Sequence, residues 1–205
     1  MIRRLTAALV VLVACGCGHE KSPPPVVRDG DVIFQESMSR QSEMVRALTR
    51  SRWTHVGVVF HEGGNAMVFE AVSPVRRTPL AAFVARGRDR RFVVKRLRDA
   101  ENRLTPETLS KMKALGKTWL GRPYDLQFRW DDGALYCSEL VHKLFARAAR
   151  IELGTIERAS DMNLDDDRVK RALAKRFARG GFDPAEPVVT PDSIFGDAEL
   201  VEVAH

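Results

Sequence analysis

The sequence predicts a single α+β domain, and three observations support this fold class. The chain has 205 residues, of which 44% are hydrophobic, which is enough for one buried core. Residues 54–74 contain two β-branched apolar runs on either side of a glycine-containing turn, which is typical of a β-hairpin. Segments with helical periodicity alternate irregularly with short strand-like runs. We therefore expect one α+β domain over residues 29–205.

The elements before the first long helix follow from local patterns. "GDVIF" is a short β-branched run, and "SMSRQSEMVRALTR" places Met38, Ser42, Val45 and Leu48 on one helical face. "LAAFVARG" predicts a short helix that stops at Gly87. These patterns predict, in order, a strand at 30–34, a helix at 37–50, the hairpin at 54–74, a helix at 80–87 and a strand at 91–97.

The second half of the chain is predicted to be mainly helical. Thr105 is suited to be a helix N-cap, Pro106 to be the first helical residue and Gly121 to end the helix. From Cys137 onward, apolar residues recur at helical spacing through Leu140 and Leu144. The expected elements are a helix at 105–121, a helix that begins near Cys137, a helix at 165–178 and a strand at 198–203.

The N-terminus resembles a bacterial lipoprotein signal. Two arginines precede an apolar run that is too short to span a bilayer, and the run ends in "LVAC", which resembles a lipobox. We expect a signal at 1–17 with lipid on Cys15, or on Cys17 as a weaker candidate, and a proline-rich tether at 18–28. A plain cleaved signal is the alternative. Both interpretations predict export to the cell envelope, and the first predicts a membrane-anchored protein facing the periplasm.

Basic residues exceed acidic ones, with a net charge of +6 and clusters at 86–91 ("RGRDRR") and 168–180 ("RVKRALAKRFARG"). We expect both clusters to be solvated faces. The alternative is contact with anionic lipid headgroups or cell-wall polymers. Nucleic acid is not an expected partner, because no aromatic residues interleave with these charges and the chain is predicted to be exported.

Cys137 is the only cysteine of the predicted domain, so it has no partner for an internal disulfide if Cys15 or Cys17 carries lipid. A thiol in the first turn of a helix faces unpaired N–H groups and the positive end of the helix dipole, which favour a thiolate. The same N–H groups suit an oxyanion. A lone cysteine is nevertheless more often a small core residue, so Cys137 needs a base.

Of the five histidines, two lie on the first strand of the predicted hairpin. His19 lies in the tether, His205 ends the chain, and His142 is about 500° around the helix from Cys137 at ~100° per residue, so it faces away from the sulfur. His55 and His61 remain. His61 lies beside the turn, where we expect it to be solvated.

The hairpin register predicts a carboxylate near His55. A turn centred on Gly63 and Gly64 places His61 opposite Ala66, Gly57 opposite Glu70 and His55 opposite Val72. His55 and Glu70 are then diagonal neighbours, roughly 7–8 Å apart at the backbone. A carboxylate there orients the ring of a catalytic base. An exposed polar pair is the alternative, and a three- or five-residue loop would put Glu70 on the other face.

Other chemistries find little support in the sequence. One cysteine and scattered histidines lack the spacing of a metal site, so no metal or cofactor is expected. Ser138 lacks the G-x-S-x-G context of a serine nucleophile.

Two motifs, "GRPYD" at 121–125 and "LYCSELV" at 135–141, resemble the signature of NlpC-type papain-like cysteine amidohydrolases. In that family the cysteine precedes the histidine, whereas His55 precedes Cys137 here. This order resembles the circularly permuted, YiiX-like branch. Further similar segments are "GDVIFQ" at 30–35, "THVGVVF" at 54–60, "VFEAVSPVRRTPL" at 68–80 and the tail "TPDSIFGDAELVEV".

The resemblance implies a permuted papain-like fold, in which the cysteine helix packs on an antiparallel sheet. It implies Cys137 as nucleophile, His55 as base, Glu70 as orienting residue and Tyr124 near the oxyanion or substrate. Tyr136 and Glu139 depart from the aspartate and glycine of the NlpC signature, which puts its cell-wall specificity in doubt. The expected activity is cleavage of an amide or ester through an acyl-enzyme.

The alternatives are a lipid-directed acyltransferase or N-acyl amide hydrolase, a cell-wall peptide endopeptidase and, less favoured, a binding module without activity. The expected substrate is therefore lipid-linked or a cell-wall peptide, and the sequence gives no oligomeric state.

Overall fold

The computed structural model describes residues 26–178 and 181–203. Several predicted features lie outside these ranges: the signal at 1–17, the tether as far as residue 25, His19 and His205. Eight strands are present in the described part: β1 (Val32–Ser37), β2 (His55–Glu62), β3 (Asn65–Glu70), β4 (Arg76–Pro79), β5 (Gly87–Leu97), β6 (Ile156–Arg158), β7 (Pro187–Val189) and β8 (Leu200–Glu202). The helices are α1 (Arg40–Thr49), α2 (Leu80–Ala85), α3 (Ala100–Arg103), α4 (Pro106–Trp119), α5 (Cys137–Ala149), the 3₁₀ turn η1 (Ala159–Asp161), α6 (Asp167–Arg176) and α7 (Pro191–Phe195).

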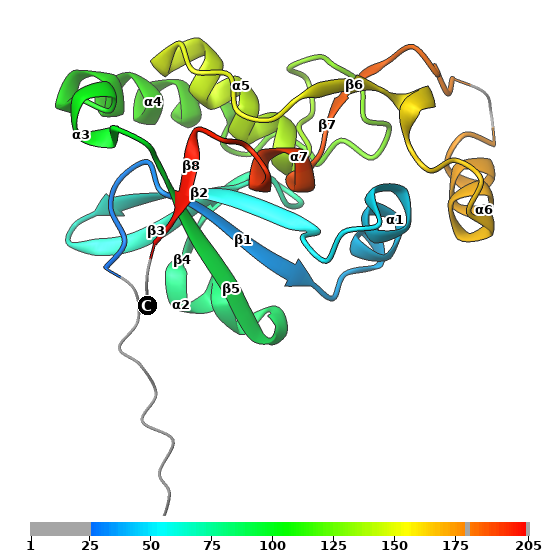
Figure 1. Cartoon of the computed structure of the whole chain (residues 1–205), viewed down its shortest axis with the longest axis horizontal. Helices are drawn as coiled ribbons and strands as arrows, with labels where there is room; N and C mark the ends of the chain where they lie inside the picture. The colour runs from blue at the N-terminus through cyan, green and yellow to red at the C-terminus, as the bar shows by residue number, and fades with distance from the viewer. Residues whose placement is uncertain (1–25, 179–180, 204–205) are drawn as a thin grey trace, which may run out of the picture.

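A six-stranded antiparallel sheet is the centre of the fold. Its strand order is β4-β3-β2-β1-β5-β8, and β6 and β7 form a separate two-stranded sheet. Helices α4 and α5 lie over one face of the large sheet and the short α2 lies under the other, while α1 and α6 pack together at one end (Figure 1). The architecture is therefore α+β, as the sequence predicts, with the cysteine-bearing helix against an antiparallel sheet.

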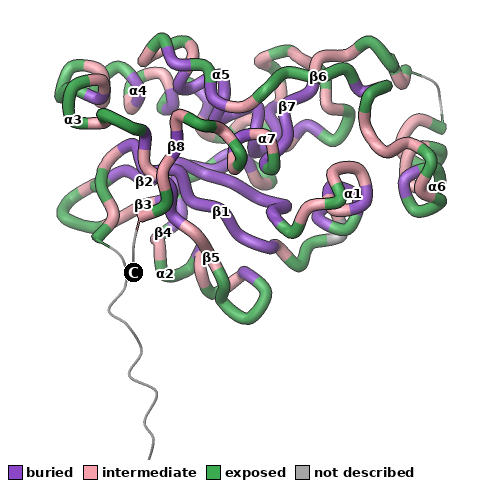
Figure 2. Tube along the Cα trace, in the orientation of Figure 1, coloured by how far each residue is buried: buried purple, intermediate pink, exposed green. Residues whose placement is uncertain are grey.

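The hydrophobic core has two parts, one on each face of the sheet. The larger cluster lies between the sheet and helices α4 and α5, where strand residues such as Val56 and Val58 meet Leu140 and Leu144. A smaller cluster around Ile33 and Val59 is covered by Phe83 of α2. Buried backbone runs along β1 and β2 and into α5 (Figure 2). The sheet and α5 are thus a rigid base for the residues at their ends.

Local signals explain the helix boundaries well. Thr105 caps α4 by accepting a hydrogen bond from the Thr108 N–H, and Pro106 is the first helical residue, as predicted. The helix at 37–50 begins later, at Arg40, with Ser39 as its N-cap. Met38 therefore precedes the helix and is 64% exposed, so its predicted place on the apolar face is wrong.

Two other boundaries differ from the prediction. Gly87 is the first residue of β5 rather than a helix stop, so this strand has 11 residues and includes most of the basic cluster at 86–91. The second hairpin strand ends at Glu70, and His55 pairs with Gln35 of β1 instead of Val72. Pairing with β1 continues the sheet beyond the hairpin, which the hairpin register alone did not predict.

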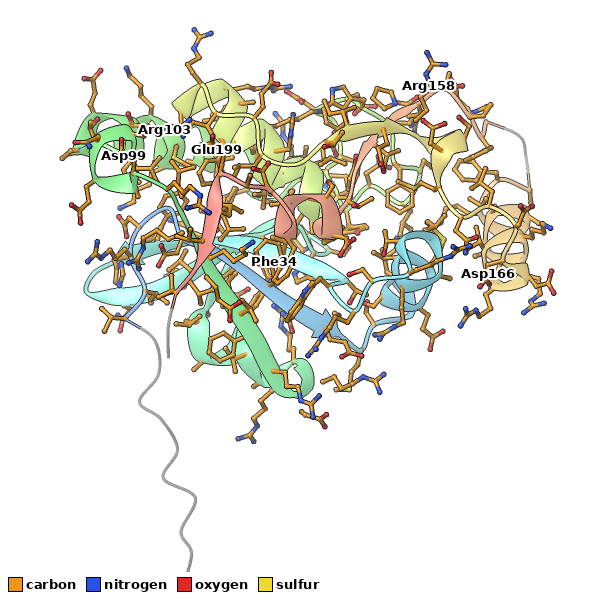
Figure 3. All side chains as sticks on the ribbon, in the orientation of Figure 1. Phe34, Asp99, Arg103, Arg158, Asp166 and Glu199 are labelled. Carbon is orange, nitrogen blue, oxygen red and sulfur yellow. The ribbon has the colours of Figure 1, made fainter. Side chains whose placement is uncertain are left out.

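The C-terminal segment closes the sheet edge. β8 pairs with β5, and Arg103 of α3 forms an ion pair with Glu199 just before β8 (Figure 3). Across residues 26–178 and 181–203, no helix has the length and apolar character needed to cross a membrane.

Candidate active site

Cys137 is the first residue of α5 and is almost fully buried. Two side chains beside it join the start of α5 to strand β7. The Ser138 hydroxyl donates to the Val189 carbonyl at 2.8 Å, and the Val189 N–H donates to the Tyr136 hydroxyl at 3.2 Å. The residues that precede and follow Cys137 are therefore both held by β7, which fixes the position of the thiol.

His55 and Glu70 meet at the ends of neighbouring strands. The pair His61–Ala66 has the predicted register, which places Gly57 opposite Glu70. His55 Nε2 and Glu70 Oε2 are 2.6 Å apart, and both side chains are buried. This contact fixes the orientation of the ring and leaves Nδ1 for the cysteine.

Three groups hold the Glu70 carboxylate. Besides His55, the Thr78 hydroxyl and Arg86 Nη2 each donate to Oε1 at 2.5 Å. Burial raises the pKa of Glu70, but the bonds to His55 and Thr78 and the charges of His55 and Arg86 outweigh it and lower the pKa to about 2. Glu70 is therefore ionised over the whole neutral range.

The His55 ring is held from its face as well as its edge. It stacks on Phe83 of α2 with ring centroids 5.6 Å apart. Burial lowers the pKa of His55, but the hydrogen bonds and negative charges of Cys137 and Glu70 outweigh burial and raise the pKa to about 9. The ring is thus a cation when the thiol is ionised.

The same pairing acts on the thiol. Burial raises the pKa of Cys137, but the hydrogen bond to and charge of His55, together with the N–H groups of Val56 and Ser138, lower it below the ordinary thiol value. A buried thiolate–imidazolium pair results, in which the sulfur faces backbone N–H groups at the start of α5. This arrangement is that of an activated nucleophile and its base.

Tyr124 lies beside the Cys137 thiol, where the resemblance led us to expect it. It precedes α5 in a loop and forms a bridge with Leu135. Burial, the negative charge of Cys137 and a hydrogen bond to Cys137 raise the pKa of Tyr124 well above its ordinary value. The hydroxyl therefore stays protonated and available as a donor to an oxyanion.

The remaining histidines of the described chain are engaged elsewhere. His61 is exposed, as predicted, and its Nδ1 is 2.8 Å from Asp29 Oδ1. His142 is buried on the far side of α5, with Nδ1 2.8 Å from the Leu153 carbonyl oxygen. The serine at 138 donates its hydroxyl to Val189 and faces no base.

Thr78 and Arg86 are site residues that the sequence analysis missed. Arg86 belongs to the basic cluster expected to be solvated, yet it is half-buried and paired with Glu70. In the same cluster, Arg88 pairs with Glu36. The pairing of β3 with β4 places Thr78 near Glu70, so a correct prediction of β4 would have identified Thr78. The sequence did not predict β4.

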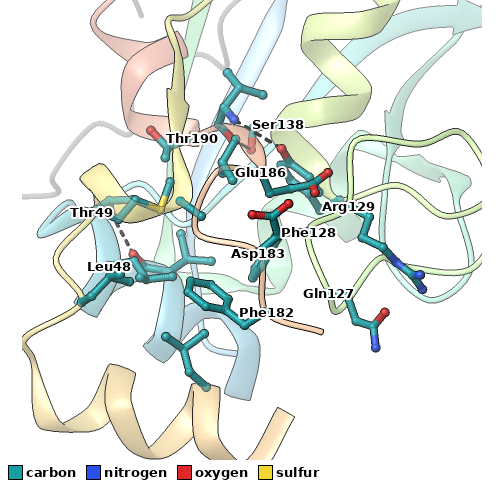
Figure 4. A pocket seen from close by; sticks show the side chains of 18 of the residues that line it. Leu48, Thr49, Gln127, Phe128, Arg129, Ser138, Phe182, Asp183, Glu186 and Thr190 are labelled. Carbon is teal, nitrogen blue, oxygen red and sulfur yellow. Dashed lines mark hydrogen bonds between the residues drawn. The ribbon is translucent and has the colours of Figure 1, made fainter. Parts of the chain in front are cut away.

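Two pockets meet at Cys137, His55 and Tyr124. One contains about 740 Å³ of empty space, part of it open to solvent; it is reached by Cys137 and lies between α1, α6 and the segment before β7 (Figure 4). Its walls are mainly apolar: Val45, Leu48, Phe128, Met162, Leu164, Leu173, Phe177, Phe182, Val188 and Val189. The other contains about 780 Å³ of empty space, part of it open to solvent; it is reached by His55 and is rich in hydroxyl groups. Tyr124 lines both pockets.

The chain is similar to known proteins in family profile, sequence and fold. The profile of the family described as permuted papain-like amidase enzymes (YaeF/YiiX, C92 family) matches residues 26–204. The uncharacterized protein YiiX of Escherichia coli (strain K12) is 34% identical over 175 residues, which cover 85% of each chain. The crystal structure of the metalloprotein YiiX from Escherichia coli O157:H7 has a TM-score of 0.80 at 34% identity and covers 86% of this chain and 96% of its own.

That crystal structure is described as one of a metalloprotein, so the donor set of the present chain bears on whether a metal fits. In the part of the chain that the structure describes, no group of three or more His, Cys, Asp and Glu side chains is arranged to hold a metal ion. His55 and Glu70 bind each other instead of converging on a common point. The described residues therefore do not fit a metal centre.

Proposed function

The chain belongs to the family of permuted papain-like amidases and is a cysteine hydrolase, and from this premise we propose that it cleaves an amide bond through Cys137, His55 and Glu70. The single observation that carries the proposal is the contact of 2.6 Å between His55 and Glu70 beside a buried thiol whose pKa is lowered by the same histidine. Nucleophile, base and orienting carboxylate are thereby joined in one chain of contacts.

Hydrolysis takes two steps. The Cys137 thiolate attacks the amide carbonyl and forms a bond from carbon to Sγ, while N–H groups at the start of α5 and the Tyr124 hydroxyl stabilise the oxyanion. His55 then gives its proton to the leaving nitrogen as the C–N bond breaks. Water attacks the resulting thioester, gives a proton to His55 and releases the carboxylic acid, which restores the thiolate.

Labelling with a thiol-reactive acyloxymethyl ketone tests the nucleophile. In the full chain, peptide mass spectrometry should find the label on Cys137, with none at that peptide in Cys137→Ala. His55→Asn should slow the labelling, whereas His61→Asn, which changes an exposed histidine of the same strand, should not. Equal labelling rates in the two histidine variants would refute the proposed pairing.

The apolar pocket favours a lipid-like acyl group over a cell-wall peptide. The acyl group becomes attached to Cys137, which lies in this pocket and not in the hydroxyl-rich one. At the rim, Asp183 and Glu186 already accept the N–H groups of Ala185 and Trp130. A charged peptide stem would lose its hydration along the apolar walls, because Arg129, Asp183 and Glu186 are the only charged side chains of the described lining. N-acyl amide hydrolysis is therefore the form of the activity that we propose.

Chain length tests this choice. For N-acyl amides of one amine, kcat/KM should rise by about fourfold per methylene, since each buried CH₂ contributes ~0.8 kcal/mol, until the pocket is full. Leu173→Trp, on the pocket side of α6, should shorten the preferred chain. Ala174→Trp, on its exposed side, should not. Preference for peptidoglycan fragments over every N-acyl amide would favour the endopeptidase instead.

Transfer to an alcohol or amine is the remaining alternative to hydrolysis. The acceptor would replace water in the second step, so the two outcomes separate when products are measured by mass spectrometry with and without added glycerol. We also propose that the chain is exported and anchored through lipid on Cys15 or Cys17, on the basis of the N-terminal pattern. Metabolic labelling with an alkyne fatty acid, in Cys15→Ser and Cys17→Ser variants, tests the anchor and identifies the modified residue.

A further inference from the structure

The hydroxyl-rich pocket beside His55 has an unusual balance of charge. Its described lining includes no aspartate or glutamate, but it includes Arg86 and His55, which is the imidazolium of the thiolate pair. The lining residues that carry hydroxyl groups are Ser37, Ser39, Ser42, Thr54, Ser73 and Tyr124. Glu70 lies behind His55 and is already engaged by Thr78 and Arg86 as well. The charged side chains that line this pocket are therefore both positive, while their negative partners, Glu70 and Cys137, lie outside its lining.

Two lining side chains also carry N–H groups without a partner. Gln41 Nε2 and Arg86 Nε are buried and have no hydrogen-bond acceptor among the described residues. Arg176 Nη2 donates to Gln41 Oε1 at 2.5 Å, which fixes the amide so that its nitrogen is the free end. Nη1 of the same Arg176 guanidinium is also buried and has no hydrogen-bond acceptor among the described residues. Buried donors in this state are costly unless an acceptor arrives.

Other charges near the pocket do not supply that acceptor. Glu36 of β1 is paired with Arg46 of α1 and Arg88 of β5. Asp125, behind Tyr124, accepts the N–H groups of Gln127 and Arg129. Gln35 Oε1 is a buried acceptor without a partner, but it makes no hydrogen bond with Gln41 Nε2 or Arg86 Nε. Among the described residues, these two donors therefore have no acceptor.

We propose that this pocket is an anion subsite for the leaving group, and that the preferred amine carries a carboxylate, as in an N-acyl amino acid. The inference rests on the proposed function, because His55 protonates the leaving nitrogen and so places the amine on its own side of the scissile bond. The acyl chain extends from Cys137 into the apolar pocket, and the carboxylate of the amine meets Gln41 and Arg86. Cleavage releases a fatty acid and a free amino acid.

Binding to the Cys137→Ala variant tests the subsite without turnover. N-octanoylglycine and N-octanoylglycinamide differ only in the carboxylate, so isothermal titration should give about tenfold to hundredfold tighter binding for the acid, as for hydrogen bonds to a charged group. Added salt should reduce this ratio. Equal affinity for the two ligands would overturn the inference.

Substitution of Gln41 identifies the residues responsible. Gln41→Leu removes the free donor and should reduce the acid-to-amide ratio, and Gln41→Glu should abolish or reverse it. Met38→Glu is the matched control, because it adds the same charge at an exposed position near the pocket mouth that is not part of the lining. If the acid-to-amide affinity ratio fell equally in Met38→Glu and Gln41→Glu, the effect would be due to the electrostatic field of any added negative charge. That result would overturn the subsite. Thermal unfolding of each variant verifies that the fold is intact.

Turnover separates this inference from the proposed function. With the unmodified nucleophile, hydrolysis of both octanoyl compounds at equal kcat/KM, lost in Cys137→Ala, would retain the amidase and overturn the anion subsite. Hydrolysis of neither compound, together with tight and carboxylate-dependent binding, would overturn the proposed amidase activity on this class and retain the subsite. The predicted result is hydrolysis of both, with the acid preferred.

Discussion

Gly57 lies opposite Glu70 on the β2–β3 hairpin, and a Cβ atom at Gly57 would be 3.4 Å from the Glu70 Cβ. The same atom would be only 2.5 Å from Val68 Cγ1 and 3.0 Å from the Phe69 carbonyl oxygen. The absence of a side chain at Gly57 therefore permits the close pairing that brings Glu70 to His55.

Gly57→Ala should consequently destabilise the fold by about 1–3 kcal/mol, because the clash involves backbone and a buried strand rather than a free side-chain end. Urea unfolding followed by circular dichroism measures this change. Gly133→Ala is the control: its added Cβ would meet only Asp131 Oδ1 at 3.1 Å, in an exposed loop. Equal free energies of unfolding for the two variants would show that β3 can move to accommodate the added methyl group without a loss of stability.

The pH dependence of kcat/KM should report the charge on His55. Activity should fall as pH rises through the His55 pKa of about 9, because the leaving nitrogen then lacks a proton donor. Glu70→Gln removes the negative charge that favours the imidazolium, so the falling limb should move about 1 to 3 pH units lower. An unchanged limb in Glu70→Gln would mean that another group titrates there. Glu62→Gln, which alters an exposed carboxylate of the same hairpin, serves as control.

Tyr124→Phe tests the oxyanion donor. Loss of one such donor typically lowers kcat by about 10²- to 10³-fold, and the expected change is in kcat rather than KM, because the bond strengthens as charge develops on oxygen. Phenylalanine keeps the ring that lines both pockets. Steady-state kinetics on one amide substrate gives both constants. A rise in KM with kcat unchanged would assign Tyr124 to ground-state binding instead.

Glu139→Ala should reduce stability. Glu139 and Lys143 form a buried pair at 2.6 Å within α5, and Lys143 also reaches Asp132 at 3.0 Å. Burial raises the pKa of Glu139 to about 8, and Lys143 keeps the Asp131 carbonyl and Asp132 as acceptors, so the loss of this one hydrogen bond should cost about 1–3 kcal/mol. Chemical denaturation measures the loss.

An exposed pair with the same spacing is the matched control for Glu139. Glu107 and Lys111 form an ion pair on the surface of α4. Glu107→Ala should leave stability unchanged within error, because solvent screens such pairs. A similar loss in the two variants would mean that burial of the α5 pair has no special cost.

The sequence predicted most of what depends on local patterns. Thr105 and Pro106 mark the start of α4, and the turn at Gly63 and Gly64 sets the register that aligns Gly57 with Glu70. The contact between His55 and Glu70 follows from that register. The helical position of Cys137 follows from periodicity, and its proposed role as nucleophile comes from the resemblance to the permuted family.

Features that depend on distant segments could not be predicted in this way. Arg86 reaches Glu70 because α2 packs beneath the sheet, and nothing in the "RGRDRR" cluster separates it from solvated arginines. The pairing of His55 with Gln35 could be predicted only if β1 were known to be the neighbour of β2 in the sheet. The apolar pocket is assembled from α1 and from two segments that follow it by more than a hundred residues, α6 and the stretch before β7.

The attachment of α5 to Val189 has a consequence for when the enzyme becomes active. A chain synthesised from its N-terminus completes His55, Glu70 and Cys137 well before Val189, which holds both Ser138 and Tyr136. Until that strand arrives, the start of α5 lacks these two hydrogen bonds and the pocket lacks one wall. The proposed nucleophile is thus synthesised before the strand that fixes the start of α5, and the arrival of that strand completes the proposed site.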